Sequence, residues 1–158
     1  MFVTDGGVEL AVPEIMARAV NVEGISILGG EPFEQAEGVA ELARAAKQRG
    51  LTVMVYSGYT LAELKAEART RPAVSAVLAA CDLLVDGRYD RTKPEPSPPI
   101  GRRWIGSTNQ VVHYLTTAYT AGEPQMHDAN TVEIHWVDGR LIVNGWPSGA
   151  AALTMRKR

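Results

Sequence analysis

Short apolar runs alternate with amphipathic segments between residues 12 and 86. Residues 25–28 (ISIL), 51–56 (LTVMVY) and 82–87 (DLLVDG) have the pattern of short buried strands. Residues 51–56 are largely apolar and β-branched, as expected of a strand covered on both faces. The intervening residues 12–20, 33–49, 61–68 and 73–80 are predicted to be helical. This β-α alternation predicts an α/β domain with a parallel sheet, which we interpret as a partial (β/α) barrel.

Local signals mark where these helices begin and end. Thr60 and Glu63 have the spacing of a capping box at the start of one helix. Lys47 and Arg49 precede Gly50, the combination that commonly ends a helix.

The pattern changes after residue 87. Residues 88–103 carry four prolines between positions 94 and 99, which excludes a helix or a central strand. This long loop is either a surface excursion or a cover over the site. Residues 104–110 (WIGSTNQ) are predicted to be a strand ending in a polar turn, and His113 to lie in a helix.

The C-terminal segment alternates around Asp138-Gly139, a strong signal for a two-residue hairpin turn. This turn would pair Trp136 with Leu141 and Ile134 with Val143. We therefore divide the chain into an α/β domain, residues 1–125, and an antiparallel hairpin extension of that domain, residues 126–158.

Composition narrows the function classes. The 158 residues have a net charge of -2, so no basic field favours nucleic acid or an anionic membrane. The sequence has no apolar run long enough to span a bilayer and no signal-peptide pattern, and we expect a cytoplasmic protein. Cys81 is the single cysteine, and its apolar neighbours predict a buried structural thiol. The three histidines have no ligand spacing, so no metal site is predicted.

Polar, glycine-bearing turns follow the predicted strands at LGGEP, SGYT, VDGRY and IGSTNQ. Ligands of parallel α/β sheets bind outside the carboxyl ends of the strands, so these turns should converge on one site. Gly29 and Gly30 permit close backbone approach, Pro32 stiffens the turn, and Glu31 offers a carboxylate suited to an ammonium group. Alternatively, the glycines only make a tight turn and Glu31 caps the next helix.

The order of GISILGGEPFEQ, VMVYSGYTLAEL, CDLLVDGRYD and RWIGSTNQVVHYLT resembles the radical S-adenosylmethionine activating enzymes, and most closely those of anaerobic ribonucleotide reductase. The resemblance covers residues 20–120. It implies that the turn formed by Gly29, Gly30, Glu31 and Pro32 binds the amino group of the methionine moiety of S-adenosylmethionine. It also implies that the later strand ends line the cofactor cleft, with these candidate residues: Ser57, Asp86, Ser107 and Asn109. For these four residues a helix-capping or turn role stays open.

The sequence departs from the family in one respect. Family members carry a CxxxCxxC motif whose three thiolates hold a 4Fe-4S cluster, and this sequence contains no such motif. We expect that the first strand and the cluster loop are missing and that Met1 is an internal or misassigned start. The edge exposed by a missing strand would favour self-association.

Three functions from different classes follow. The chain is the S-adenosylmethionine-binding part of an activase, whose partner would be a glycyl radical enzyme such as anaerobic ribonucleotide reductase. Alternatively, it is a binding module without redox activity. A third alternative is an interaction protein derived from the same fold.

Overall fold

The computed structural model describes residues 10–96, 100–128, 132–137 and 140–145. The chain forms two compact units. One comprises residues 1–94 and 105–121, and the other comprises residues 95–104 and 122–158.

The first unit is built on a four-stranded mixed sheet with the order β1-β2-β3-β4. Its strands are β1 (Gly24–Ile27), β2 (Thr52–Tyr56), β3 (Leu83–Asp86) and β4 (Val111–Tyr114). β1 pairs parallel with β2, and β2 pairs parallel with β3. β4 pairs antiparallel with β3, with Asp86 opposite Val111. The expected α/β class is confirmed, whereas closure into a barrel stays a prediction.

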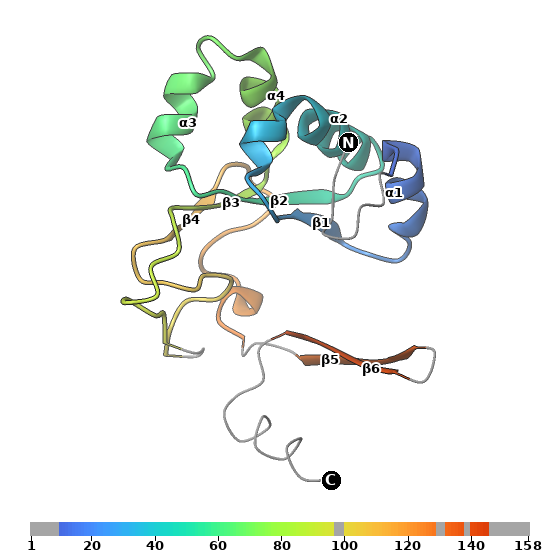
Figure 1. The fold of residues 1–158 in the computed structure, drawn as a ribbon, viewed down its shortest axis with the longest axis vertical. Coiled ribbons are helices and arrows are strands. Elements are labelled where there is room, and N and C mark those ends of the chain that lie inside the picture. Colours follow the sequence, from blue (N-terminus) through green and yellow to red (C-terminus); the bar gives the residue numbers. More distant parts are fainter. Residues whose placement is uncertain (1–9, 97–99, 129–131, 138–139, 146–158) are drawn as a thin grey trace, which may run out of the picture. The chain divides into compact units, whose positions relative to one another are not determined.

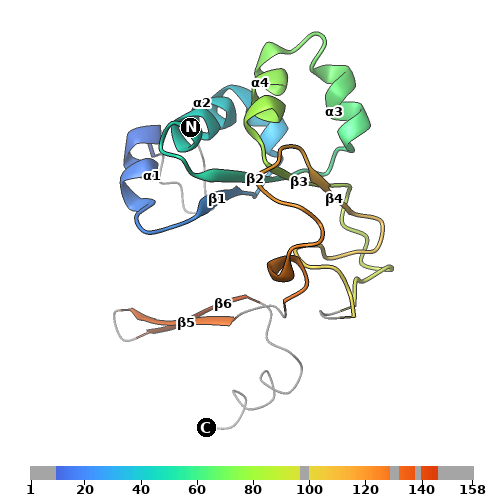
Figure 2. The same cartoon turned by 180° about the vertical axis from the view of Figure 1, so that it is seen from behind.

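The helices of this unit lie on one face of the sheet in both views (Figures 1 and 2). They are α1 (Val12–Arg18), a 3-10 turn η1 (Pro32–Gln35), α2 (Ala36–Gln48), α3 (Leu61–Glu67) and α4 (Pro72–Ala80). Parallel neighbours joined by right-handed crossovers place their helices on the same face, which explains this layout. None of the described helices has the length and apolar character required to cross a bilayer.

The core lies between the helices and the sheet. The most deeply buried side chains include Phe33 of η1, Val39 of α2 and Leu84 of β3, each 0% exposed. On β2, the consecutive residues Val53, Met54 and Val55 are all buried. Because consecutive strand residues point to opposite faces, β2 is covered on both, as its sequence predicted.

The predicted helix boundaries agree closely with the structure. Thr60 and Glu63 form the capping box of α3, in which Thr60 N donates to Glu63 Oε2 at 2.7 Å. Gly50 has a φ of 75°, the left-handed conformation that ends α2 without a Cβ penalty.

The prediction for residues 104–114 was wrong in detail. WIGSTNQ contains no described strand. The strand is Val111–Tyr114 and includes His113, which we had placed in a helix. It also runs against β3, so the expectation of parallel strands throughout fails at this edge. The alternating side chains of VVHY suit a strand, but pairing with β3 is a long-range contact that local periodicity does not encode.

β1 is at the opposite edge of the sheet and pairs, among the described residues, with β2 alone. The predicted open edge falls here, and self-association through it stays a prediction.

The second unit contains η2 (Pro124–Met126) and an antiparallel pair, β5 (Val132–Val137) and β6 (Arg140–Gly145). The register of β5 and β6 pairs Trp136 with Leu141 and Ile134 with Val143, which confirms the predicted pairing. The turn residues 138–139 lie outside the described residues.

The expected long loop is confirmed, since described residues 88–96 and 100–110 form no helix and no named strand. Whether this loop covers the site stays open. The division at residue 125 is likewise still a prediction.

Candidate functional site

The four glycine-bearing turns meet at one end of the strands of the first unit. The carboxyl ends of β1, β2 and β3 lie there. Because β4 is antiparallel, its amino end lies there too, with Val111 beside Asp86. The IGSTNQ turn therefore reaches the predicted end of the sheet by preceding its strand instead of following it.

Glu31 connects the turns after β1 and β2. Its Oε1 accepts hydrogen bonds from Ser57 Oγ at 2.9 Å and from Phe33 N at 3.1 Å. Its Oε2 accepts a hydrogen bond from Gly58 N at 2.8 Å. The bond to Phe33 makes Glu31 the N-cap of η1, so the capping role is real. Since a carboxylate has about four acceptor positions, Oε2 retains capacity for one further donor.

A cavity of about 180 Å³ is lined by Ser57 and Gly58, the two residues after β2 that donate to this carboxylate, whereas Glu31 itself does not line it. Its wall is formed by residues in or next to the turns at the strand ends: Gly29, Gly30, Tyr56, Ser57, Gly58, Gly87, Tyr89 and Gln110. Gly29, Gly30 and Gly87 have φ values of 93°, 56° and 97°, which side chains other than glycine rarely adopt. Burial raises the pKa of Tyr56 to about 12, so its phenol remains neutral at physiological pH.

Hydrogen bonds of Ser57 and Asp86 connect neighbouring segments at this end of the strands. Ser57 is 6% exposed, and besides donating to Glu31 its Oγ accepts from Tyr59 N at 3.0 Å. Asp86 is 5% exposed and accepts from Leu61 N at 2.6 Å, which fixes the start of α3. His113 Nε2 is 2.8 Å from Asp86 Oδ2, but without the alignment of a hydrogen bond.

Ser107 and Asn109 lie in the connection that returns to β4. Ser107 is 0% exposed, and its Oγ accepts from Asp90 N at 3.0 Å. Asn109 Nδ2 donates to Arg88 O at 2.7 Å. Of the eight predicted residues, Gly29, Gly30 and Ser57 line the small cavity, and Glu31 binds its wall.

Sequence reasoning missed five residues of this site: Tyr56, Gly58, Gly87, Tyr89 and Gln110. The glycines follow predicted strands and could have been found by the same argument as Gly29. Gln110 and Tyr89 belong to the recognised IGSTNQ and VDGRY turns, and Tyr56 ends the predicted strand 51–56, but nothing local singles out these three side chains.

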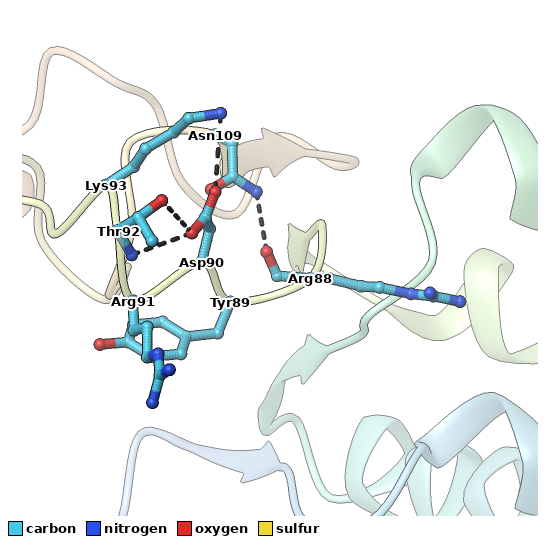
Figure 3. Close-up of a pocket in the computed structure, with 7 residues that line it drawn as sticks. All are labelled: Arg88, Tyr89, Asp90, Arg91, Thr92, Lys93 and Asn109. Atoms are coloured by element: carbon cyan, nitrogen blue, oxygen red, sulfur yellow. Dashed lines mark hydrogen bonds and ion pairs between the residues drawn. The ribbon is translucent and has the colours of Figure 1, made fainter.

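A larger cavity of about 600 Å³ lies along the outer side of the loop after β3. It is lined by residues 88–93 and Asn109. Figure 3 shows that the side chains of Arg88, Arg91 and Lys93 extend in three different directions from this loop. Lys93 Nζ also lies 3.5 Å from Asp90 Oδ2, so this cation already has an anionic partner. The cations do not converge, so the small cavity at the strand ends is the better candidate site.

The sequence belongs to a known family. Residues 9–113, about two thirds of the chain, match the family described as "4Fe-4S single cluster domain". The chain therefore belongs to this family and, together with the relatives below, to the radical S-adenosylmethionine activases.

Several curated relatives carry the name "anaerobic ribonucleoside-triphosphate reductase-activating protein". The chain is 32% identical to the one from Pasteurella multocida over 99 residues, which cover 60% of this chain and 57% of the relative. It is 33% identical to that of Escherichia coli K12 over 97 residues, or 59% and 56% of the two chains. The match to the Salmonella typhi protein has 32% identity over 108 residues, or 66% and 64%. The chain thus spans less than two thirds of the length of these relatives.

The residues of this chain do not fit the cluster after which the family is named. Such a cluster is held by several cysteine thiolates, and the sequence has Cys81 alone. Cys81 is 0% exposed, its Sγ donates to Leu83 O at 3.0 Å, and burial raises its pKa to about 12. The described part of the chain also has no group of three histidine, cysteine or acidic residues that could hold a metal.

Proposed function

We propose that this chain is the S-adenosylmethionine-binding part of an activating protein for anaerobic ribonucleotide reductase. The bound group would be the methionine end of S-adenosylmethionine, which carries an ammonium and a carboxylate. The observation that carries the proposal is that the Glu31 carboxylate accepts hydrogen bonds from Ser57 and Gly58, two residues that line the glycine-bearing cavity. The partner would be a glycyl radical enzyme, in keeping with the names of the relatives.

The geometry suits an amino-acid ligand in two respects. Three donors hold the Glu31 carboxylate in one orientation, which reduces the entropy lost when a ligand ammonium binds. Gly29 and Gly30, both at positive φ, leave the cavity without Cβ atoms on that side. A compact charged group could therefore approach the backbone closely.

The chain's own residues supply binding and no redox centre. Because the cysteine content does not fit a cluster, we derive no reductive step from these residues. A ligand-binding module without redox activity is accordingly the second candidate function, and the buried state of Cys81 is the observation that favours it.

The test is calorimetric titration of the purified chain with S-adenosylmethionine. Glu31→Gln removes a charge-assisted hydrogen bond, worth about 1.5 to 3 kcal/mol. The affinity should fall roughly tenfold or more. Ser57→Ala retains the charge and loses one donor to it, so its affinity should fall less.

The matched control is Glu37→Gln, which removes the same charge from an exposed position in the first turn of α2. It should bind like the wild type. Thermal unfolding of each variant separates lost binding from lost folding, because the amide nitrogen introduced by Glu31→Gln would face either Gly58 N or the donors Ser57 Oγ and Phe33 N. Equal affinity of the wild type and Glu31→Gln, with both folded, would remove Glu31 from the site.

A further inference from the structure

The two ends of the connection between β3 and β4 are hydrogen-bonded to each other. Asn109 Nδ2 donates to Arg88 O at 2.7 Å, and Gln110 Nε2 donates to Gly87 O at 3.0 Å. In the other direction, Asp90 N donates to Ser107 Oγ at 3.0 Å. Three side chains of the STNQ segment thus hold three peptide groups within residues 87–90.

Backbone contacts continue this pairing along the connection. Thr108 N donates to Lys93 O at 2.8 Å, and Pro94 forms an isolated bridge with Ser107. Gln110 Oε1 accepts from Gly106 N at 2.9 Å and from Ser107 N at 3.1 Å, so the segment also holds itself. The connection is therefore closed at residues 94 and 107, before the chain enters the second unit.

The residues held in this way form one wall of the candidate site. Gly87 and Tyr89 line the small cavity, and Gly87 has a φ of 97°. The ring of Tyr89 lies against Gly106, where an added Cβ would be 3.0 Å from ring atoms Cδ2 and Cε2. The Tyr89 side chain is 63% exposed, so core packing does not fix its position. The contact with Gly106 and the backbone hydrogen bonds beside Tyr89 restrict where its ring lies.

The polar ends of these three side chains are directed to the protein itself. The Asn109 amide nitrogen binds one carbonyl of the wall, and both polar atoms of the Gln110 side chain bind backbone groups. Ser107 is 0% exposed. Such groups can shape a ligand site without contacting the ligand.

We propose that Ser107, Asn109 and Gln110 are positioning residues that act as a clamp on the turn at residues 87–90. The clamp sets the position of Gly87 and Tyr89 at the wall of the cavity. As far as the ligand is concerned, this inference rests on the proposed binding of S-adenosylmethionine.

Two variants open the clamp with little change in side-chain volume. Gln110→Glu keeps an acceptor for Gly106 N and Ser107 N but loses the donor to Gly87 O. Asn109→Leu loses the donor to Arg88 O. Thr92→Val is the matched control, because it removes a hydroxyl hydrogen bond to the Asp90 side chain in the same loop but leaves the three clamp hydrogen bonds in place.

The first measurement is the amide spectrum of the nitrogen-15-labelled chain. The signals of residues 87–90 should shift or broaden in both clamp variants, while those of β1 and α2 stay in place. The second measurement is calorimetry with S-adenosylmethionine. In Asn109→Leu, the loss of one neutral hydrogen bond should weaken the affinity roughly three- to tenfold. Thr92→Val should leave the affinity unchanged.

Unmoved signals of residues 87–90 would overturn the clamp. So would a loss of affinity in Thr92→Val equal to that of the clamp variants. If the wild type binds no S-adenosylmethionine, the proposed function fails, and the amide signals then decide the clamp alone.

Discussion

The buried Asp82 carboxylate connects several segments of the first unit at the end of the strands opposite the candidate site. Asp82 is 1% exposed and lies just before β3. It accepts hydrogen bonds from Lys47 Nζ at 2.8 Å, Val53 N at 2.9 Å and Thr116 Oγ1 at 2.6 Å. One side chain therefore connects α2, β2, β3 and the segment after β4.

The charge of Asp82 should make the stability of the protein depend on pH. Burial acts to raise its pKa, but the hydrogen bonds from Lys47, Thr116 and Val53 outweigh burial, and the pKa is lowered. The unfolded state thus binds the proton more tightly than the folded state. The stabilisation is complete above the ordinary aspartate pKa of about 3.9, and it is lost as the pH falls through the lower folded value.

We predict that Asp82→Asn lowers the free energy of unfolding by about 1 to 3 kcal/mol at pH 7, because the charge is lost and the new amide nitrogen faces the Lys47 ammonium and either Thr116 Oγ1 or Val53 N. Urea unfolding between pH 7 and pH 3 measures this, and the difference from the wild type should shrink below about pH 4. The control is Glu67→Gln, which breaks a half-exposed ion pair with Arg71 within one helical turn and should cost about 0.5 kcal/mol or less. A constant difference across this pH range would contradict the assignment.

At the scale of elements, the position of β1 depends on a glycine. β1 and β2 pair with Gly24 opposite Thr52, and Thr52 N also donates to Glu23 O at 3.1 Å. A Cβ at residue 24 would lie 2.1 Å from Thr52 Oγ1 and 2.6 Å from Thr52 O. The hydroxyl can rotate away, but the backbone oxygen cannot move without disturbing the pairing.

Gly24→Ala should therefore lower the free energy of unfolding by about 1 to 3 kcal/mol, as overpacking does. Thermal or urea unfolding measures the loss. Gly122→Ala serves as the control, since an added Cβ there meets no atom within 4 Å. If the two substitutions have equal effects, the close approach of β1 to β2 at Gly24 is not a determinant of stability.

At the scale of the whole molecule, the chain belongs to a family named after an iron-sulfur cluster, but its sequence has a single cysteine. Burial raises the pKa of the Cys81 thiol to about 12, so almost no thiolate is present near neutral pH. Thiolates are the form that binds iron. Cys81 therefore contributes to the core and offers no cluster ligand.

We predict that this chain, incubated anaerobically with iron and sulfide, develops no broad visible absorption of a 4Fe-4S cluster. A thiol reagent should modify Cys81 slowly in the folded chain and rapidly in denaturant, which checks the burial independently. A sequence extended by a segment with three cysteines is the positive control. A stable cluster formed by the chain alone, for instance between the Cys81 thiolates of several copies, would contradict the prediction.

Patterns within a few residues determined much of the structure. The capping box of Thr60 and Glu63 and the end of α2 at Gly50 depend on neighbours within one helical turn, so the sequence predicted both correctly. The pairing of Trp136 with Leu141 follows from alternation around a short turn. The meeting of the glycine-bearing turns at one edge followed from the parallel order of β1, β2 and β3.

Contacts between distant residues were decided by the tertiary structure. The direction of β4 depends on pairing with β3, and the Glu31 carboxylate reaches Ser57 and Gly58, which are 26 and 27 positions further along the chain. The clamp joins side chains 17 to 23 positions from the backbone groups they bind. No periodicity in the sequence encodes such distances, because they depend on which elements pack together. The sequence by itself located the turns of the site, and the packing of the sheet decided which residues hold its wall and which face its cavity.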